Sequence, residues 1–278
     1  MRCVGSCGAC FELRRSQREA SYLLAQYLLS PPGSAFDPPC SLARHTRSPG
    51  QQLAVLELGS GSGFVARQLS HVLRLSNSYM SPDMGFDKLV ATDLPNVCEL
   101  LAENVAGNGI QVAALPWGDE HAVTSVIVDE HLDDDMGVRL THIVCCDLVY
   151  FPHLLAPLLR TLLALTTRFP DVQLLFACKC TCDHNASFAD STCSTDKMRS
   201  MTKEQPFWAA VGMWFELERV QTPEGRGDDL FLFISRRKPT TRGWVVPEGD
   251  SELLNGVGLP SRAGADTFDC MLMMDIGC

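Results

Sequence analysis

The 278-residue chain has no apolar run of the roughly 18 to 20 residues that a membrane span requires. Its longest candidate, residues 154–165, is interrupted by Pro157 and Arg160. The first ten residues also lack the apolar core of a secretory signal peptide. We therefore expect a protein of the cytoplasm, with the nucleus as a second location, and no association with a membrane.

The chain also lacks an excess of positive charge. It has 33 Asp and Glu against 23 Lys and Arg, and its net charge is -10. Proteins that bind nucleic acids neutralise phosphates with basic side chains, so no nucleic-acid partner is expected. The acidic balance suits a basic protein substrate. The 13 cysteines are odd in number and lack two paired C-x-x-C units. We expect free thiols and no metal site.

The middle of the chain alternates between apolar strands and helices, which predicts a mostly parallel sheet covered on both faces. Strands are predicted over 54–58, 88–92, 112–115, 142–146 and 172–178, and helices over 64–75, 95–105, 154–167 and 207–215. Two further strands, over 216–221 and 230–235, are joined by a glycine-rich connection typical of an antiparallel hairpin. The predicted fold class is α/β, with a doubly wound seven-stranded sheet that ends in this hairpin.

The domain organisation follows from these patterns. Residues 1–50 are predicted to hold a helix over 12–29 and a flexible loop, residues 51–238 the domain, and residues 239–278 a poorly structured tail. The apolar face expected on the first helix is formed by Tyr22, Leu23, Ala25, Gln26 and Leu29. Two insertions, over 76–87 and 119–139, are expected to interrupt the core.

A short apolar run over 55–58 ends in three alternating glycines, Gly59, Gly61 and Gly63. A strand followed by glycines and a helix is how a doubly wound domain opens a cofactor site. The helix offers free N–H groups at its start, and the glycines let a ligand approach the backbone. An ordinary strand-to-helix turn is the alternative. The spacing lacks the further glycine of the dinucleotide fingerprint, which disfavours a nicotinamide-dependent oxidoreductase.

Polar or aromatic residues follow the ends of the next three strands. Asp93 can accept hydrogen bonds from both ribose hydroxyls of a nucleoside ligand, or it can cap the helix that begins at Pro95. Trp117 can lie on a purine face, with Asp119 accepting from an exocyclic amine, or it can belong to the core. Asp147 and Tyr150 can face a substrate; the alternatives are a helix cap for Asp147 and a partly buried ring for Tyr150.

Together these segments resemble the seven-strand S-adenosylmethionine-dependent methyltransferases, and more narrowly the protein-lysine methyltransferases of methyltransferase family 16. The resemblance covers about residues 15–237 and is carried by the stretches 55–63, 91–95, 115–119 and 147–150. It implies S-adenosyl-L-methionine as cofactor, and a cofactor site formed by Glu57, Gly59, Ser60, Gly61, Asp93, Leu94, Trp117 and Cys146.

Within that implied site, the turn from Gly59 to Gly61 lies against the methionine and ribose end of the cofactor. Asp93 binds the ribose, and Trp117 and Cys146 border the adenine. The catalytic residues implied are Asp147 and Tyr150, which face the substrate lysine.

The resemblance thus predicts a protein-lysine N-methyltransferase that acts on a non-histone protein as a monomer. Related enzymes modify elongation factors, chaperones and AAA-type ATPases, so a translation factor, a chaperone or such an ATPase is the expected class of partner. Two alternatives stay open: a methyltransferase acting on a small molecule or another protein side chain, and a non-catalytic binding protein of the same fold. The last is suggested by Arg18, which stands where the family has tryptophan; Cys146 stands where alanine is common.

Overall fold

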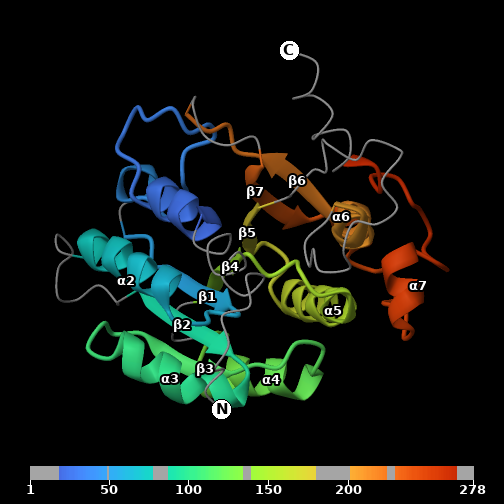
Figure 1. The fold of residues 1–278 in the computed structure, drawn as a ribbon, viewed down its shortest axis with the longest axis horizontal. Helices are drawn as coiled ribbons and strands as arrows, with labels where there is room; N and C mark the ends of the chain where they lie inside the picture. The colour runs from blue at the N-terminus through green and yellow to red at the C-terminus, as the bar shows by residue number, and fades with distance from the viewer. Residues whose placement is uncertain are drawn as a thin grey trace, which may run out of the picture.

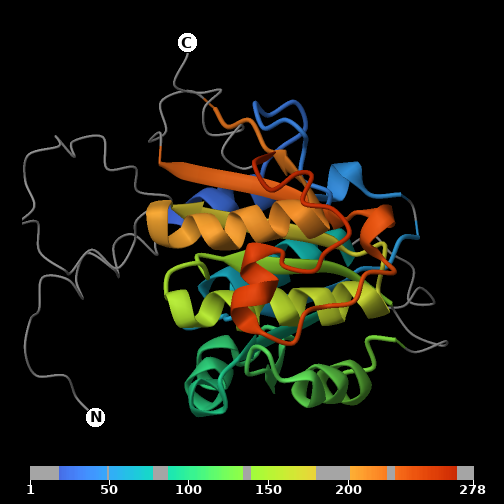
Figure 2. The ribbon, with the colours of Figure 1, turned by 90° about the vertical axis from the view of Figure 1, so that its right-hand side faces the viewer.

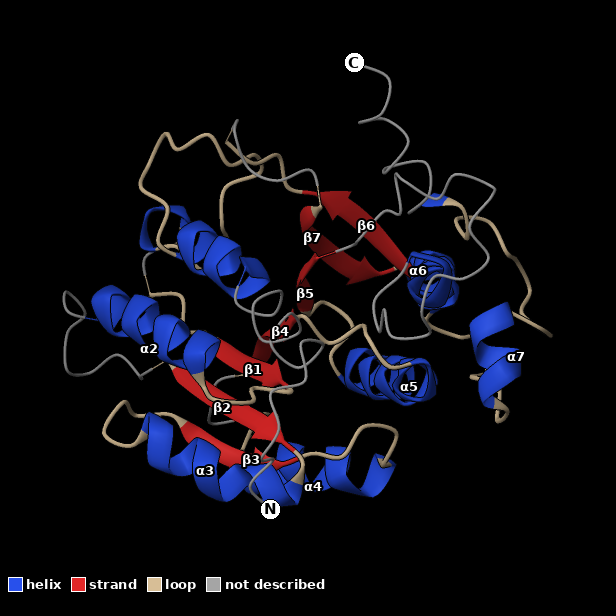
Figure 3. Cartoon of the chain, in the orientation of Figure 1, coloured by secondary structure: helices blue, strands red, loops and turns tan. Residues whose placement is uncertain are grey.

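The computed structural model describes residues 19–48, 50–77, 87–133, 139–179, 201–223 and 229–267. They form a seven-stranded sheet in the order β3-β2-β1-β4-β5-β7-β6 (Figures 1 and 3). The strands are β1 (Ala54–Leu58), β2 (Lys88–Asp93), β3 (Gln111–Ala114), β4 (Leu140–Cys146), β5 (Gln173–Lys179), β6 (Phe215–Arg219) and β7 (Leu230–Arg237). The first five strands are parallel, and β7 is antiparallel to both β5 and β6. The predicted fold class is confirmed.

Helices cover both faces of the sheet. They are α2 (Phe64–Asn77), α3 (Pro95–Val105), α4 (Glu120–Asp129), α5 (Pro152–Arg168), α6 (Met201–Trp214) and α7 (Asp250–Asn255), with short 3-10 helices η1 (Arg44–Thr46) and η2 (Pro239–Thr241) and a helix over 19–28. The helix over 19–28, α2 and α3 pack on one face, and α4, α5 and α6 on the other. Because both faces are covered, β1 is buried along its whole length. Within the described residues, no helix is both long and apolar enough to cross a membrane.

The predicted bounds lie within two residues of the observed ones, except for α6, which begins six residues before the predicted 207. The predicted apolar face of the first helix is right for Leu23 and Ala25, which are buried. It is wrong for Gln26, which is exposed, and for Tyr22 and Leu29, which are 52% and 45% exposed. The buried residues of this helix, which follow its 3.6-residue period, are Ala20, Leu23, Leu24, Ala25, Tyr27 and Leu28. Residues 12–18, including Arg18, lie outside the described part of the chain.

Two segments expected to be loose are packed. In the loop over 31–48, Phe36, Cys40 and Leu42 are buried, so a flexible loop is wrong for these residues. The segment predicted as an insertion over 119–139 contains α4, whose Val123 and Val126 join the core. Two buried valines three residues apart are enough here, because α5 and the sheet complete the contact surface. Residues 78–86 of the other predicted insertion, and 134–138 of this one, lie outside the described residues.

The segment predicted as a poorly structured tail is also packed, since residues 239–267 lie against the rest of the domain. Leu253 of α7 is fully buried in the main core, and Thr241 of η2 is buried as well. The Trp244 ring meets the Trp214 ring edge to face at 5.4 Å. Figure 2 shows this segment crossing over α5 and α6. The predicted poorly structured tail is therefore wrong up to residue 267, and residues 268–278 lie outside the described part.

We expect Arg237→Ala to lower the free energy of unfolding by about 3 kcal/mol. The guanidinium is buried over the Trp214 ring at 4.7 Å, and its Nε donates to Thr241 Oγ1 at 2.8 Å. The substitution leaves a void and removes the donors to the Thr241 hydroxyl and carbonyl oxygens. Denaturant unfolding measures the change, with Arg242→Ala as control, because Arg242 forms an exposed ion pair with Asp171 and an exposed hydrogen bond to the Pro170 carbonyl. Equal losses in both variants would contradict this expectation.

Candidate functional site

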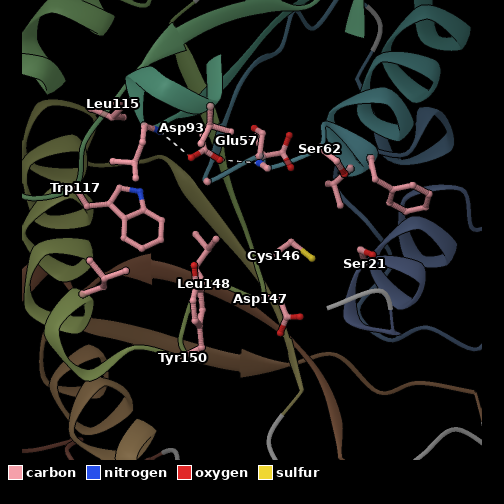
Figure 4. A pocket seen from close by; sticks show the side chains of 18 of the residues that line it. Ser21, Glu57, Ser62, Asp93, Leu115, Trp117, Cys146, Asp147, Leu148 and Tyr150 are labelled. Atoms are coloured by element: carbon pink, nitrogen blue, oxygen red, sulfur yellow. Dashed lines mark hydrogen bonds between the residues drawn. The ribbon is translucent and has the colours of Figure 1, made fainter. Parts of the chain in front are cut away.

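A cavity of about 840 Å³ opens at the carboxyl edge of the parallel strands, where the turns after β1, β2, β3 and β4 meet (Figure 4). This is the size of a small-molecule site, at the place where doubly wound folds bind ligands. The residues of the implied cofactor site and the two implied catalytic residues all line it: Glu57, Gly59, Ser60, Gly61, Asp93, Leu94, Trp117, Cys146, Asp147 and Tyr150. The structure therefore brings the predicted set together, and the individual roles stay predictions.

The three glycines of the turn differ in what surrounds them. All have positive φ, at 61° for Gly59, 55° for Gly61 and 79° for Gly63. A Cβ on Gly59 would lie 2.7 Å from Leu148 Cδ2 and 2.9 Å from Trp117 Cζ2, whereas a Cβ on Gly61 would meet open space. A Cβ on Gly63 would lie 2.5 Å from Val105 Cγ1. Gly59 and Gly61 thus shape the cavity, and Gly63 lets α2 pack against α3.

Asp93 joins the end of β2 to the glycine turn. Its Oδ2 accepts a hydrogen bond from the Gly61 amide at 2.7 Å, and its Oδ1 accepts from the Leu94 amide at 2.7 Å. The N-cap of α3 is Leu94, so Asp93 does not cap this helix. The carboxylate instead fixes the turn at the cavity wall and lies beside Glu57 in Figure 4.

Trp117 lines the cavity and is half-buried, with its indole beside Gly59. Asp119, in contrast, does not line the cavity. Its side chain accepts from the backbone amides of His121 at 2.9 Å and Ala122 at 3.0 Å, which makes it the N-cap of α4. The predicted contact of Asp119 with an exocyclic amine is therefore wrong, because the helix that begins at Glu120 takes its carboxylate.

Glu57 is the buried acid of the site. It is 2% exposed, and its Oε2 has no hydrogen-bond partner among the described residues. Burial, assisted by the nearby Asp93 carboxylate, raises the pKa of Glu57 from 4.5 to about 8. A cationic group bound in the cavity would favour the ionised form of this acid.

We expect the contribution of Glu57 to the free energy of unfolding of the ligand-free chain to fall as the pH rises from about 4.5 to about 8. In that window the folded chain holds a proton on Glu57 that the unfolded chain has lost. The decrease is on the order of a few kcal/mol, since each pKa unit corresponds to about 1.4 kcal/mol. Buried His142, whose pKa burial lowers from 6.5 to about 4, has the opposite effect below pH 6.5, so denaturant unfolding of the wild type is compared with that of Glu57→Gln at each pH. The difference in the free energy of unfolding between these two should change with pH by this amount, and the difference between the wild type and Glu103→Gln, on an exposed part of α3, should stay constant.

Asp147 follows β4 in an unusual backbone conformation. Its φ is 63°, a left-handed value that is uncommon for residues other than glycine. Its amide donates to the Ala177 carbonyl of β5 at 2.7 Å, and its side chain is only 6% exposed. The N-cap of α5 is Phe151, so Asp147 does not cap that helix. Asp147 lines the cavity, and Figure 4 shows its side chain on the side away from Asp93 and Glu57.

Tyr150 completes this side of the cavity. Its ring is partly buried and lies 4.5 Å from the Phe151 ring. Tyr150 is therefore partly buried, as the alternative had it, and also lines the cavity, as predicted. In Figure 4, Asp147 and Tyr150 lie on the side of the cavity opposite Asp93 and Glu57.

Further residues line the cavity that the sequence did not predict. Ser21 and Tyr22 come from the first helix, and Phe64 begins α2. The Tyr22 and Phe64 rings meet edge to face at 5.2 Å. The signal available in the sequence was that Tyr22 lies off the buried period of its helix, which leaves a large aromatic side chain for another use.

One comparison with known proteins identifies a family. The family model described as lysine methyltransferase matches residues 18–194, which include every residue predicted for the site. No curated protein sequence matches the chain. Solved structures that resemble it are distant, and the chain spans about half the length of the first two.

The first is described as a pericyclic reaction enzyme, with 13% identity, a TM-score of 0.44, and coverage of 82% of this chain and 55% of that one. The second is OxaC in complex with SAH and oxaline, with 13% identity, a TM-score of 0.44, and coverage of 79% and 47%. A third, mitomycin 7-O-methyltransferase, has 13% identity and a TM-score of 0.42, with coverage of 83% and 67%.

Proposed function

The chain belongs to the lysine methyltransferase family, and from this premise we propose that it transfers a methyl group from S-adenosylmethionine to a lysine side chain of a non-histone protein. The observation that carries the proposal is the single cavity that brings Asp147 and Tyr150 together with the glycine turn, Asp93 and Trp117. Methyl transfer needs donor and acceptor in one enclosed site, and these residues come from four separate strand ends.

The residues of the cavity fit S-adenosylmethionine, which the family uses as its cofactor. Gly59 leaves free the space that a Cβ would fill between Leu148 and Trp117. The buried Glu57 offers an oxygen without a hydrogen-bond partner among the described residues, which suits a ligand with positive charge. We assign Asp93 to the ribose, Trp117 and Cys146 to the adenine, and the turn over 59–61 to the methionine end.

When bound, the cofactor supplies a methyl group activated by its sulfonium. The chain has to hold the lysine nitrogen in line and remove its charge, since a free lysine is protonated at neutral pH. The Asp147 carboxylate and the Tyr150 hydroxyl, on the far side of the cavity, are placed to accept hydrogen bonds from the ammonium and to orient it. Burial in the cavity lowers the pKa of the amine, against the opposite effect of the Asp147 carboxylate, so that the ammonium releases a proton to water before the neutral nitrogen accepts the methyl group.

A protein substrate is supported by the charge of the chain. The net charge of -10 attracts basic segments, in which lysines are frequent. A translation factor, a chaperone or an AAA-type ATPase is the class of partner that we propose, in the cytoplasm or the nucleus, with the chain acting as a monomer.

Incubation with cell extract and labelled S-adenosylmethionine tests the function. We expect label on a protein band, and mass spectrometry should place it on a lysine. Label on small molecules only, or on another side chain, would favour the alternative methyltransferases. If calorimetry detects no binding of S-adenosylmethionine, the chain is a binding protein with this fold.

A further inference from the structure

Lys179, the last residue of β5, joins parts of the chain that are far apart in sequence. Its ammonium contacts the Glu19 carboxylate of the first helix, and its Nζ lies 3.1 Å from Asp229 Oδ2, just before β7. The Lys179 side chain is only 18% exposed, whereas those of Glu19 and Asp229 are 35% and 38% exposed. We call these three residues the Lys179 clamp.

The clamp lies directly beside residues of the cavity. Glu19 precedes Ser21 and Tyr22, which line the cavity from the first helix. Glu19 and Tyr22 are three residues apart, and helical residues at this spacing lie on the same side of the helix. The Tyr22 ring contacts Phe64 at the start of α2. A displacement of Glu19 would therefore move the part of the wall that Ser21 and Tyr22 provide.

On the sheet side, the clamp is connected to the acceptor end of the site. Ala177, two residues before Lys179, accepts the backbone hydrogen bond of Asp147. The same strand thus supports Asp147 and, at its end, holds the first helix. Two elements that are distant in sequence are tied across the cavity through β5.

The charges of the clamp are mutually dependent. Burial lowers the pKa of Lys179, but the hydrogen bonds that its ammonium donates to Glu19 and Asp229 and the charge of both carboxylates raise the pKa by more, so the net direction is upward. Because the ammonium is largely shielded from water, these ion pairs are screened less than exposed ones. Without the ammonium, both carboxylates would lose their ion pair with Lys179.

We propose that Lys179 is a positioning residue for the cofactor, which acts by holding the first helix over the cavity through Glu19. This rests on the proposed function, since it takes the cavity as the S-adenosylmethionine site. The clamp sets the affinity for the cofactor and leaves the chemical step to Asp147 and Tyr150.

Lys179→Met tests the proposal, because methionine keeps the apolar stem and removes the charge. We expect the Kd and the KM for S-adenosylmethionine to rise about tenfold, with kcat within a factor of about two. Lys179→Arg should restore most of the affinity. Raising the salt concentration should weaken cofactor binding by the wild type more than by Lys179→Met. Arg242→Met, which removes the exposed pair with Asp171, is the matched control and should bind as the wild type does.

The outcomes separate the clamp from the proposed function. If the wild type binds S-adenosylmethionine and Lys179→Met binds it equally well, the clamp is overturned and the function stands. A lower Tm with an unchanged Kd would show a merely structural role and would also overturn the clamp. A wild type that does not bind S-adenosylmethionine overturns the function, and the clamp with it.

Discussion

Replacing Asp147 by asparagine should lower kcat for lysine methylation by at least about 100-fold, which is the usual scale for losing an acid–base or orienting carboxylate. The Kd for S-adenosylmethionine should stay within about twofold, because Asp93 and Trp117, which we assign to the ribose and the adenine, lie across the cavity from Asp147. Asparagine is the appropriate substitution, since it tolerates the left-handed φ of 63° at this position. Alanine would add backbone strain to the loss of charge. Steady-state kinetics and calorimetry measure the two effects.

Asp119→Asn is the matched control for this experiment. Asp119 is also an acid at the carboxyl edge of the sheet, but its side chain caps α4 and does not line the cavity. Its replacement should leave kcat unchanged and cost at most about 1 kcal/mol of stability. An Asp147→Asn enzyme with the wild-type rate would remove Asp147 from the proposed mechanism.

Replacing Gly59 by alanine should weaken S-adenosylmethionine binding by about 100-fold or more. The φ of 61° costs an alanine roughly 1–2 kcal/mol. The new methyl would also lie 2.7 Å from Leu148 Cδ2 and 2.9 Å from Trp117 Cζ2, so one of these side chains has to move. Both line the cavity, and Trp117 is the side chain that we assign to adenine. Calorimetric titration measures the loss.

Gly107→Ala separates backbone strain from the change in cavity shape. Gly107 has a φ of 73°, and a Cβ there would meet nothing within 4 Å. It does not line the cavity. We expect a lower Tm and an unchanged Kd for this variant. If Gly59→Ala binds the cofactor as tightly as Gly107→Ala, the close approach at Gly59 does not matter for binding.

The sequence predicted the fold and the members of the site for one physical reason. Strands buried on both faces give continuous apolar runs, and parallel strands bring their carboxyl ends to one edge. Asp93, Trp117 and Asp147 each lie at or just after such an end, so they meet in one site although they are far apart in the chain. The predicted methyltransferase family is confirmed by the family model over residues 18–194, and S-adenosylmethionine is the cofactor that the family uses.

Other features depended on contacts that no local pattern contains. Leu253 is buried because α5 and α6 offer a surface to the short helix α7, whose six residues carry little periodicity of their own. Tyr22 reaches the cavity from the helix over 19–28, which ends well before β1 begins at Ala54. Asp119 was assigned to the ligand because a cap and a ligand contact use the same side chain at the same edge.

The packing at Gly63 changes how the glycine-rich motif should be interpreted in other sequences. A chain of this fold that had lost its catalytic activity would still require a glycine at this position, because any Cβ would collide with Val105 and force α2 and α3 apart. The third glycine, Gly63, is therefore required by the packing of two helices, whereas the first, Gly59, is required by the shape of the cavity. A search that weights all three equally would recover inactive relatives as readily as enzymes.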